Sequence, residues 1–382
     1  MKTLRFILGV CLASMLAFAP SAEAQKREKF GTDKRKAEIK KEKVQVSKET
    51  FRWKMVTPWS KGLLFQDYAE HFADTVRLAS GGRLDIKVFS AGEIVGAMES
   101  FDAVSKGSAE MGHDWPGYWK GKNEAFVAYG SVPFGLDAEG QNIWLYERGG
   151  QELMTELYGR FNMVAFPCGQ GGQEMGLFSK KKATKMADFK GMRLRTVGWY
   201  MDIMNQLGAS VSPLPGGELY LALQTGVIDA VEFSAPALNY PMGFDEISKY
   251  AIQPGVHQPS VQNACFINKS AWEKLPADLK WIVKIAAAET QLWSNVWTEN
   301  LNAEAIKRFK QKVEIVHMDD ATLSAFAQTT KKYLDELSAK NPDVKKALDS
   351  QEQLKKDFVE WRKARSGVTP WPIEDYIKGQ HN

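Results

Sequence analysis

The stretch from Asn162 to Ser260 alternates extended apolar runs with amphipathic helical runs. An apolar run enters a glycine-rich turn, a basic and apolar strand follows, and then come a helix, a Pro-Gly turn, a second helix and a short strand. This βαβα order predicts a parallel sheet whose loop residues meet at the strand ends. Gln173, Arg195 and Glu232 fall at three such ends. The pattern therefore predicts a pocket for a small anion.

The flanking sequence predicts a second unit of the same kind. Strand-like runs occupy Phe51–Val56, Arg83–Phe89 and Ala109–His113, with helical patterns at 63–79, 97–106 and 138–158. The run VQNACFIN after Ser260 predicts a strand that returns to this unit, and a long helical region is expected from Ser270 to Lys312. The 382 residues suffice for two lobes, because single cores seldom grow past about 250–300 residues.

We therefore expect an α/β chain with two lobes, doubly wound mixed sheets and C-terminal helices. The expected limits are 50–162 with about 259–290 for the first lobe, 163–258 with about 291–320 for the second, and 321–382 for a C-terminal helical segment. The apolar faces of the C-terminal helices leave two options open, packing on the first lobe or a homodimer.

The N-terminus predicts export. A short basic region precedes the apolar run Phe6–Ala19, and a small-x-small site precedes Gln25. This arrangement is typical of a secretory signal peptide cleaved after Ala24, the alternative being an uncleaved anchor. Residues 25–49 are nearly free of large apolar side chains and predict a solvated basic spacer, or an arm that touches anionic lipid.

The formal net charge of +4 does not indicate a nucleic-acid ligand. The signal segment contributes +1, and ten Lys/Arg against five Asp/Glu between Lys26 and Glu49 contribute +5. The chain from Thr50 onward is therefore close to −2, and its basicity belongs to the tail.

Two cysteines, Cys168 and Cys265, remain once the signal peptide with Cys11 is removed. Both lie in apolar runs, which fits either a disulfide or two buried thiols on neighbouring strands. No histidine stands at ligand spacing from them, which argues against a structural zinc site.

Several segments match one known family at once. They are Gly92–Val95, Phe101–His113, Tyr118–Lys122, Ser131–Leu136, Phe189–Gly198, Leu214–Glu232 and Pro254–Ser260. The chain resembles the periplasmic, DctP-type substrate-binding subunit of tripartite ATP-independent periplasmic (TRAP) transporters. The closest resemblance is to the branch that binds 2-oxo or 2-hydroxy monocarboxylates together with a metal cation.

This resemblance implies a two-lobed periplasmic binding protein, braced by a long helix, that passes a small organic acid to TRAP permease subunits. It implies that Arg195 forms a salt bridge to the ligand carboxylate, for which the guanidinium fork is well matched. It also implies that Gln173, Glu232 and the carbonyl of Phe233 hold a cation. All-oxygen ligation suits Na⁺ or Ca²⁺, and no organic cofactor is expected.

Two positions depart from the family pattern. Phe233 stands where the branch usually has tryptophan, which makes the pocket wall smaller. Gln258 stands where the loop usually carries glutamate, which removes a negative charge and weakens the case for a divalent ion. Gln258 is still a candidate ligand contact.

Aromatic residues in loops at strand ends complete the candidate set. Trp59 and Tyr118 are interpreted either as walls of the ligand pocket or as core packing. Two other functions stay open: an exported receptor for a signalling partner, and a secreted lyase or hydrolase using Glu232 and His257. The sequence has no nucleophile elbow, P-loop or paired-carboxylate motif, which disfavours the enzyme.

Overall fold

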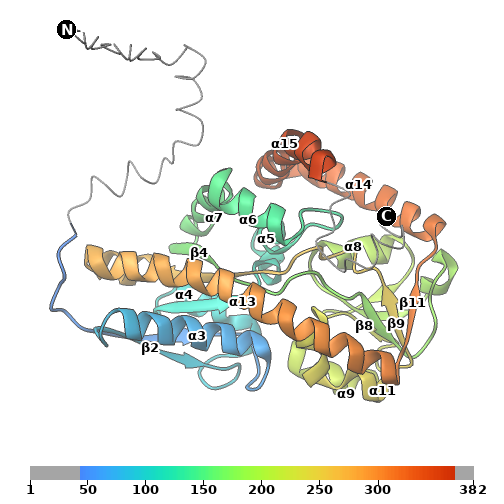
Figure 1. Ribbon diagram of the computed structural model, residues 1–382, viewed down its shortest axis with the longest axis horizontal. Helices are drawn as coiled ribbons and strands as arrows, with labels where there is room; N and C mark the ends of the chain where they lie inside the picture. Colours follow the sequence, from blue (N-terminus) through green and yellow to red (C-terminus); the bar gives the residue numbers. More distant parts are fainter. Residues whose placement is uncertain (1–43, 366–382) are drawn as a thin grey trace, which may run out of the picture. The chain divides into compact units, whose positions relative to one another are not determined.

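The structure is a computed structural model that describes residues 44–365. The predicted signal peptide and most of the basic spacer lie outside the described residues, as does everything after Arg365. The chain divides into a short unit, Met1–Val46, and a main unit that begins at Ser47 and contains all the described helices and strands (Figure 1).

The first sheet has five strands in the order β2-β1-β3-β10-β4. Its strands are β1 (Phe51–Val56), β2 (Leu84–Phe89), β3 (Met111–Asp114), β4 (Met163–Gln170) and β10 (Gln262–Asn268). β1 runs parallel to β2 and β3, whereas β10 is antiparallel to β3 and β4, so the sheet is mixed. The surrounding helices are α3 (Leu64–Ala79), α4 (Ser100–Ser105), α5 (Phe126–Gly130), α6 (Ala138–Glu147) and α7 (Gly150–Gly159), with 3₁₀ turns η1 (Ala97–Glu99) and η2 (Pro116–Gly121).

The second sheet has six strands in the order β11-β9-β5-β8-β6-β7. Its strands are β5 (Leu177–Ser179), β6 (Arg193–Arg195), β7 (Ser210–Val211), β8 (Ala230–Val231), β9 (Tyr250–Gln253) and β11 (Glu314–His317). The parallel pairs β6–β7 and β6–β8 confirm the predicted parallel core, and antiparallel β5 makes the sheet mixed. Its helices are α8 (Gly198–Gln206), α9 (Leu219–Gln224), α10 (Pro236–Asn239) and α11 (Phe244–Ile247), with η3 (Met186–Phe189), η4 (Gly216–Glu218) and η5 (Tyr240–Met242).

The strand pairing shifts the point at which the chain was expected to pass from the first lobe to the second. We placed residues from 163 onward in the second lobe, but β4 pairs with β10 along its length and so belongs to the first sheet. The chain passes to the second sheet only through the glycine-rich turn between Gln170 and Leu177. The reason is the length of the apolar run after Asn162, which is enough for a full strand beside β10. The other lobe limits stay a prediction.

Two predicted helices are interrupted where the backbone requires it. The expected helix over 138–158 splits into α6 and α7 because Gly149 adopts a left-handed φ of 81°. The long helical region from Ser270 divides into α12 (Lys269–Lys274) and α13 (Ala277–Lys312) at Pro276. A proline disfavours helical geometry in the residue before it and suits the start of the next helix.

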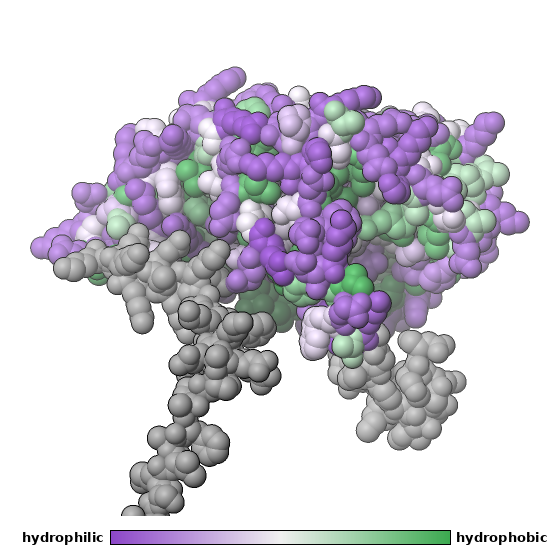
Figure 2. Space-filling view, turned by 90° about the horizontal axis from the view of Figure 1, so that it is seen from above, coloured by the Kyte–Doolittle hydropathy of each residue, from purple (hydrophilic) through white to green (hydrophobic). Residues whose placement is uncertain are grey.

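The C-terminal helices pack on the same chain. α14 (Asp320–Lys340) buries Phe326 in the core of the second sheet, and α15 (Pro342–Arg365) buries Val344, Ala347 and Leu354 in the core of the first. Figure 2 looks onto this side and shows apolar side chains recessed between hydrophilic ones. The apolar faces of the described helices are thus largely used within the chain, and a homodimer through them stays a prediction.

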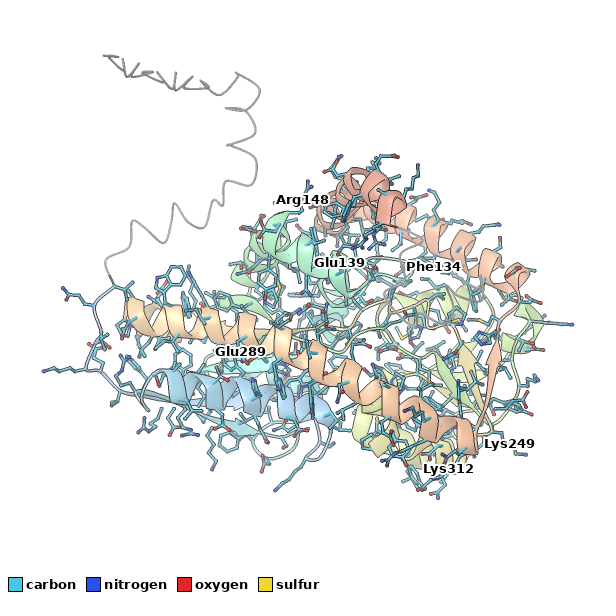
Figure 3. All side chains as sticks on the ribbon, in the orientation of Figure 1. Phe134, Glu139, Arg148, Lys249, Glu289 and Lys312 are labelled. Atoms are coloured by element: carbon cyan, nitrogen blue, oxygen red, sulfur yellow. A yellow bond between two sulfur atoms is a disulfide. The ribbon has the colours of Figure 1, made fainter. Side chains whose placement is uncertain are left out.

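Helix α13 connects the two sheets. Its N-terminal half contributes Leu279 and Val283 to the apolar cluster under β1 and α3, and its C-terminal half places Phe309 in the core of the second sheet. Figure 3 shows Glu289 beside α3 and Lys312 at the far end, where Lys312 forms an ion pair with Asp245 at 2.8 Å. This arrangement confirms the expected long helix that spans both lobes.

Cys168 on β4 and Cys265 on β10 are joined by a disulfide, which resolves the alternative left open by the sequence. Both residues are fully buried, on the neighbouring strands β10 and β4 at one side of the first sheet. Among the described helices, none combines the length and apolar character needed to cross a membrane.

Candidate anion-binding site

Arg195 ends strand β6 with its side chain buried, at 1% exposure. Its Nε donates a hydrogen bond to the carbonyl of Leu214 at 3.0 Å, and its Nη1 donates to the carbonyl of Glu232 at 2.7 Å. Its Nη2 has no hydrogen-bond partner among the described residues. A buried guanidinium with one free donor is a strong attraction for a carboxylate, because leaving the donor unpaired is costly.

Glu232 follows strand β8 and is fully buried. Its Oε1 accepts a hydrogen bond from the backbone of Val197 at 3.2 Å and lies 3.4 Å from Nη1 of Arg195. Burial alone would raise the pKa of Glu232, but the charge of Arg195 and nearby hydrogen bonds outweigh it and lower that pKa. Glu232 is therefore a carboxylate at neutral pH, and its Oε2 makes no hydrogen bond to described residues.

His257 and Glu174 lie next to Glu232 and complete a buried cluster of four charged or ionisable side chains, Arg195, Glu232, His257 and Glu174. Nε2 of His257 lies 2.6 Å from Oε2 of Glu174 and 3.8 Å from Oε2 of Glu232, and its ring stacks on Tyr200 at 4.6 Å. Burial would lower the pKa of His257, but the hydrogen bonds and charges of the two glutamates outweigh it and raise that pKa. Burial and the charge of Glu232 raise the pKa of Glu174. His257 and Glu174 are thus fixed in place by the hydrogen bond between them.

The cluster borders a small cavity with an accessible volume of about 10 Å³. Its polar lining comes from Arg195, Glu174 and Gln258, and the remaining walls are mainly apolar and aromatic: Phe65, Trp115, Tyr118, Val197, Phe233 and Val261. Apolar walls with a few convergent polar groups are typical of a ligand site. The cavity has roughly the room of one water molecule, so a bound organic acid would have to move the walls apart.

Most of the residues predicted from sequence meet at this cavity. Arg195, Phe233, Tyr118 and Gln258 line it, and Glu232 lies beside Arg195. Burial raises the pKa of Tyr118, although Arg195 opposes that shift, so its hydroxyl stays protonated and can donate. The guanidinium of Arg195 lies 5.6 Å from the ring centroid of Phe233. The ligand role of the Phe233 carbonyl stays a prediction.

Trp59 lies one layer further from the cavity. Its Nε1 donates to Nδ1 of His113 at 3.1 Å, and its ring packs 4.7 Å from Phe65 and 5.9 Å from Tyr118. It does not line the cavity, so the structure favours its reading as packing. Trp59 supports the wall residues rather than forming the wall.

Gln173 does not reach the cluster. Its side chain is exposed and lines an open groove beside α13 with Pro236 and Glu299. The adjacent residue, Glu174, points into the cluster instead. The two residues lie in the glycine-rich turn between β4 and β5, where Gln173 is exposed and Glu174 is buried. The structure therefore places Glu174, and not Gln173, beside Glu232 and His257, and the ligand role of Gln173 stays a prediction.

Trp115 also lines the cavity, although of its aromatic segment after β3 only Tyr118 was a predicted ligand contact. Three glycines make room for it, because a Cβ at Gly117, Gly130 or Gly198 would lie only 2.1–2.8 Å from its indole. Its Nε1 has no hydrogen-bond partner among the described residues. Glycine beside tryptophan in the WPGY sequence was the available signal, but the packing of Gly130 and Gly198 depends on the tertiary fold.

The donor set fits a cation. One ligand atom from each of Glu174, Glu232 and His257 lies within 4.8 Å of the others, and an oxygen of each glutamate is buried without a hydrogen bond. Gln258 adds an unpaired amide oxygen beside them. Glu174 supplies the negative charge that seemed lost with Gln258, so the set suits Ca²⁺ as well as Na⁺. The imidazole of His257 is also a suitable ligand for first-row transition metals.

Arg193, two residues before Arg195 on β6, is exposed and binds Asp229 through Nε at 3.1 Å and Nη2 at 2.9 Å. These hydrogen bonds lower the pKa of Asp229. A lowered folded-state pKa contributes stability above the unfolded value of about 3.9, and that stability is lost as pH falls. We expect Asp229→Asn to reduce the unfolding free energy by about 1 kcal/mol at pH 7.

Urea unfolding at pH 7 and at about pH 3 tests this expectation, and the difference between variant and parent should shrink at the lower pH. Asp85→Asn is the control, because its ion pair with Arg52 is largely exposed. Equal losses in the two variants, or a loss in Asp229→Asn that grows in acid, would contradict the role given to Asp229.

The sequence profile of the bacterial extracellular solute-binding proteins of family 7, called DctP, matches residues 55–341. A monocarboxylate 2-oxoacid-binding periplasmic protein of Nostoc sp. is 33% identical over 321 residues, which cover 84% of this chain and 88% of the relative. A C4-dicarboxylate-binding periplasmic protein of Rhodobacter capsulatus is 23% identical over 66% of this chain and 74% of its own length.

Three solved structures have closely similar folds. A TRAP transporter solute-binding protein of Bordetella bronchiseptica, with copurified calcium and picolinate, has a TM-score of 0.82 at 28% identity, over 87% of this chain and 98% of its own. A second, from Pseudoalteromonas atlantica with bound sodium and pyruvate, has a TM-score of 0.80 at 30% identity, over 86% of this chain and 99% of its own. A third, from Colwellia psychrerythraea with bound calcium and pyruvate, has a TM-score of 0.80 at 30% identity, over 87% of this chain and 100% of its own.

Proposed function

Because this chain belongs to the DctP family of bacterial extracellular solute-binding proteins, we propose that it captures a small 2-oxo or 2-hydroxy monocarboxylate and delivers it to a TRAP-type permease. The expected place is the periplasm, after cleavage of the signal peptide at Ala24. The relative from Nostoc sp. and the pyruvate-bound structures support this class of ligand.

The observation that carries the proposal is the free Nη2 of Arg195 at a buried cavity. The other two nitrogens of the guanidinium are fixed by backbone carbonyls, so its orientation is set before a ligand arrives. A ligand carboxylate would accept from Nη2, and the Tyr118 hydroxyl stands near enough to Arg195 to share in that contact. The mainly apolar and aromatic walls favour a short monoacid over a dicarboxylate.

We assign cation binding to Glu174, Glu232 and His257, with Gln258 as a further oxygen donor. A bound cation would supply positive charge for the ligand's second oxygen, which is a carbonyl in a 2-oxo acid and a hydroxyl in a 2-hydroxy acid. Occupancy requires His257 to release its proton, because only neutral imidazole ligates a metal. Glu174 and Glu232 then each contribute the oxygen that lacks a hydrogen bond.

A thermal-shift experiment on the mature protein tests this function. Pyruvate or lactate at about a hundred times the dissociation constant should stabilise the fold by about 2.7 kcal/mol, and the gain should depend on Na⁺ or Ca²⁺. Succinate is the control ligand and should give a much smaller shift. Absence of a shift with any short monoacid would contradict the ligand class, and steady consumption of pyruvate would favour the enzyme alternative.

A further inference from the structure

The cavity beside Arg195 has room for about one water molecule, so a ligand can enter only when the walls separate. Those walls come from two parts of the chain. Trp115 and Tyr118 follow β3 of the first sheet, whereas Arg195 and Val197 end and follow β6 of the second. We call these the first-sheet part and the second-sheet part. Contacts between the two parts outside the cavity therefore govern how easily it opens.

Helix α8 makes the first contact of this kind. It continues directly from β6 in the second-sheet part, yet it places Trp199 and Ile203 in the apolar core cluster of the first sheet. Trp199 is fully buried, and its Nε1 donates a hydrogen bond to Oε2 of Glu124 at 2.9 Å. Glu124 stands just before α5 in the first-sheet part. A tryptophan of one part is thus held inside the core of the other.

Asp202, about one turn further along α8, makes the second contact. Its carboxylate forms an ion pair with Lys120 of η2 and accepts a hydrogen bond from the hydroxyl of Tyr333 on α14 at 2.6 Å. The side chains of Lys120 and Asp202 are 17% and 29% exposed, so solvent screens this ion pair less than one on the open surface. Burial raises the pKa of Glu124, and the charge of Lys120 opposes that shift. Lys120 therefore interacts with Asp202 across the two parts and with Glu124 within its own.

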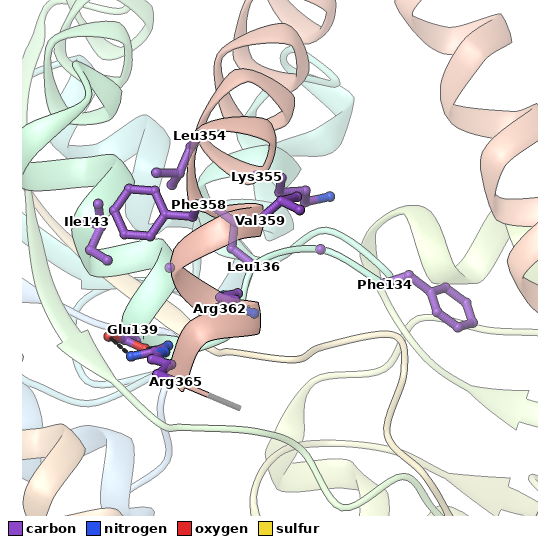
Figure 4. A pocket seen from close by; sticks show the side chains of 12 residues that line it. Phe134, Leu136, Glu139, Ile143, Leu354, Lys355, Phe358, Val359, Arg362 and Arg365 are labelled. Carbon is purple, nitrogen blue, oxygen red and sulfur yellow. Dashed lines mark hydrogen bonds and ion pairs between the residues drawn. The ribbon is translucent and has the colours of Figure 1, made fainter. Parts of the chain in front are cut away.

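A third contact joins the loop between α5 and α6 to the loop after β9. Phe134, which Figure 4 shows directed away from the pocket between α6 and α15, donates its backbone N–H to the carbonyl of Val256 at 2.8 Å. Val256 directly precedes His257 of the buried cluster, and Lys120 stands two positions after Tyr118 of the cavity wall. The contacts between the two parts thus adjoin, along the chain, the residues that surround the cavity.

We propose that α8 and the segment 120–124 form a clasp that holds the cavity closed and, from outside it, sets how tightly a bound organic acid is retained. The clasp consists of Trp199 and Asp202 on the second-sheet part and Lys120 and Glu124 on the first-sheet part. The inference rests on the proposed function, because it takes a short monocarboxylate as the ligand. Opening breaks the ion pair and withdraws Trp199 from the core. Since only the closed form retains the ligand, the apparent affinity falls with the fraction of closed molecules.

Disulfide trapping in the full mature chain measures closure without any ligand. A Cβ on Gly217 of η4 would lie 3.7 Å from the Cβ of Ser60, which follows β1, and this separation suits a disulfide. Ser60→Cys with Gly217→Cys should therefore form a bond in the closed form when oxidised glutathione is added, and the rate of trapping reports the closed fraction. The native Cys168–Cys265 pair is buried and already joined, so it does not compete.

Lys120→Met removes the ion pair of the clasp. Lys122→Met is its matched control, because Lys122 pairs with Asp102 inside the first-sheet part. In the ligand-free protein, Lys120→Met should slow trapping of the cysteine pair several-fold, and Lys122→Met should leave it unchanged. Without the added cysteines, Lys120→Met should raise the dissociation constant of pyruvate in Ca²⁺ by the same factor, through faster dissociation. Asp202→Asn should match Lys120→Met, and the two combined should add little, because they break the same contact.

The two readouts separate the clasp from the proposed function. Equal trapping and equal affinity in Lys120→Met and Lys122→Met would overturn the clasp. A weaker affinity with unchanged trapping would also overturn it, because the effect of Lys120 would then lie inside the cavity. If Lys120→Met and Asp202→Asn slow trapping while the parent binds no short monoacid, the clasp stands and the proposed ligand class fails.

Discussion

Arg195→Ala is expected to weaken binding of a short 2-oxo acid by about 2–5 kcal/mol, which is roughly 30-fold to several thousand-fold in the dissociation constant. The reason is that, among the described residues, Arg195 alone offers the cavity a guanidinium donor without a partner, and its loss leaves the ligand carboxylate unpaired in a buried place. Titration calorimetry with pyruvate in the presence of Ca²⁺ measures the change.

Two further variants separate binding from folding. Arg195→Ala also leaves Glu232 buried without its cation, so a loss of stability of about 3–5 kcal/mol is expected beside the loss of binding. Arg195→Lys keeps the charge but cannot reproduce the fixed fork, and should still weaken binding at least tenfold. Arg193→Ala is the matched control on the same strand, because its side chain faces Asp229, and it should bind as the parent does. Parental affinity in a folded Arg195 variant would refute the assignment.

Glu174→Gln is expected to remove most of the cation dependence of ligand binding. It keeps the shape of the side chain but removes one of the two carboxylates that face His257. Loss of an outer-shell partner alone costs ten- to a hundredfold in metal affinity, and loss of a charged ligand should cost at least as much. At a Ca²⁺ concentration of about a hundred times the parental dissociation constant, the stabilisation should fall from about 2.7 to about 0.4 kcal/mol.

Gln173→Ala is the control for this prediction, and it also decides between the sequence-based and the structure-based assignment. Gln173 is exposed in the structure, so its truncation should leave the Ca²⁺ titration unchanged. The thermal shift at fixed pyruvate and increasing Ca²⁺ provides the measurement. If Gln173→Ala abolished the Ca²⁺ effect and Glu174→Gln preserved it, the original assignment from the resemblance would be right and the cluster described above would not be the cation site.

Local sequence patterns were sufficient for the elements and for the two central charges. A strand-like run predicts β1 and period-two alternation predicts β2, and the order of strands and helices predicts that Arg195 and Glu232 meet at adjacent strand ends. These features follow from backbone geometry over a few residues, which sequence periodicity records directly. The resemblance to a known family added the expected kind of ligand, a carboxylate bound together with a cation.

Other features depended on contacts between distant parts of the chain. The sequence could not tell whether Gln173 or Glu174 faces inward, because the register of the glycine-rich turn is set by its packing against the 253–258 loop, where Gly255 leaves room for the carbonyl of Glu174. It could not pair Glu174 with His257, which lies 83 positions away. Strand membership of β4 likewise came from pairing with β10.

The sequence by itself thus determined an α/β chain with Arg195 and Glu232 at one sheet edge. Only the tertiary structure decided which neighbouring groups complete the site, because a buried charge is placed by its partners, and those partners come from loops whose local sequence carries no periodic signal.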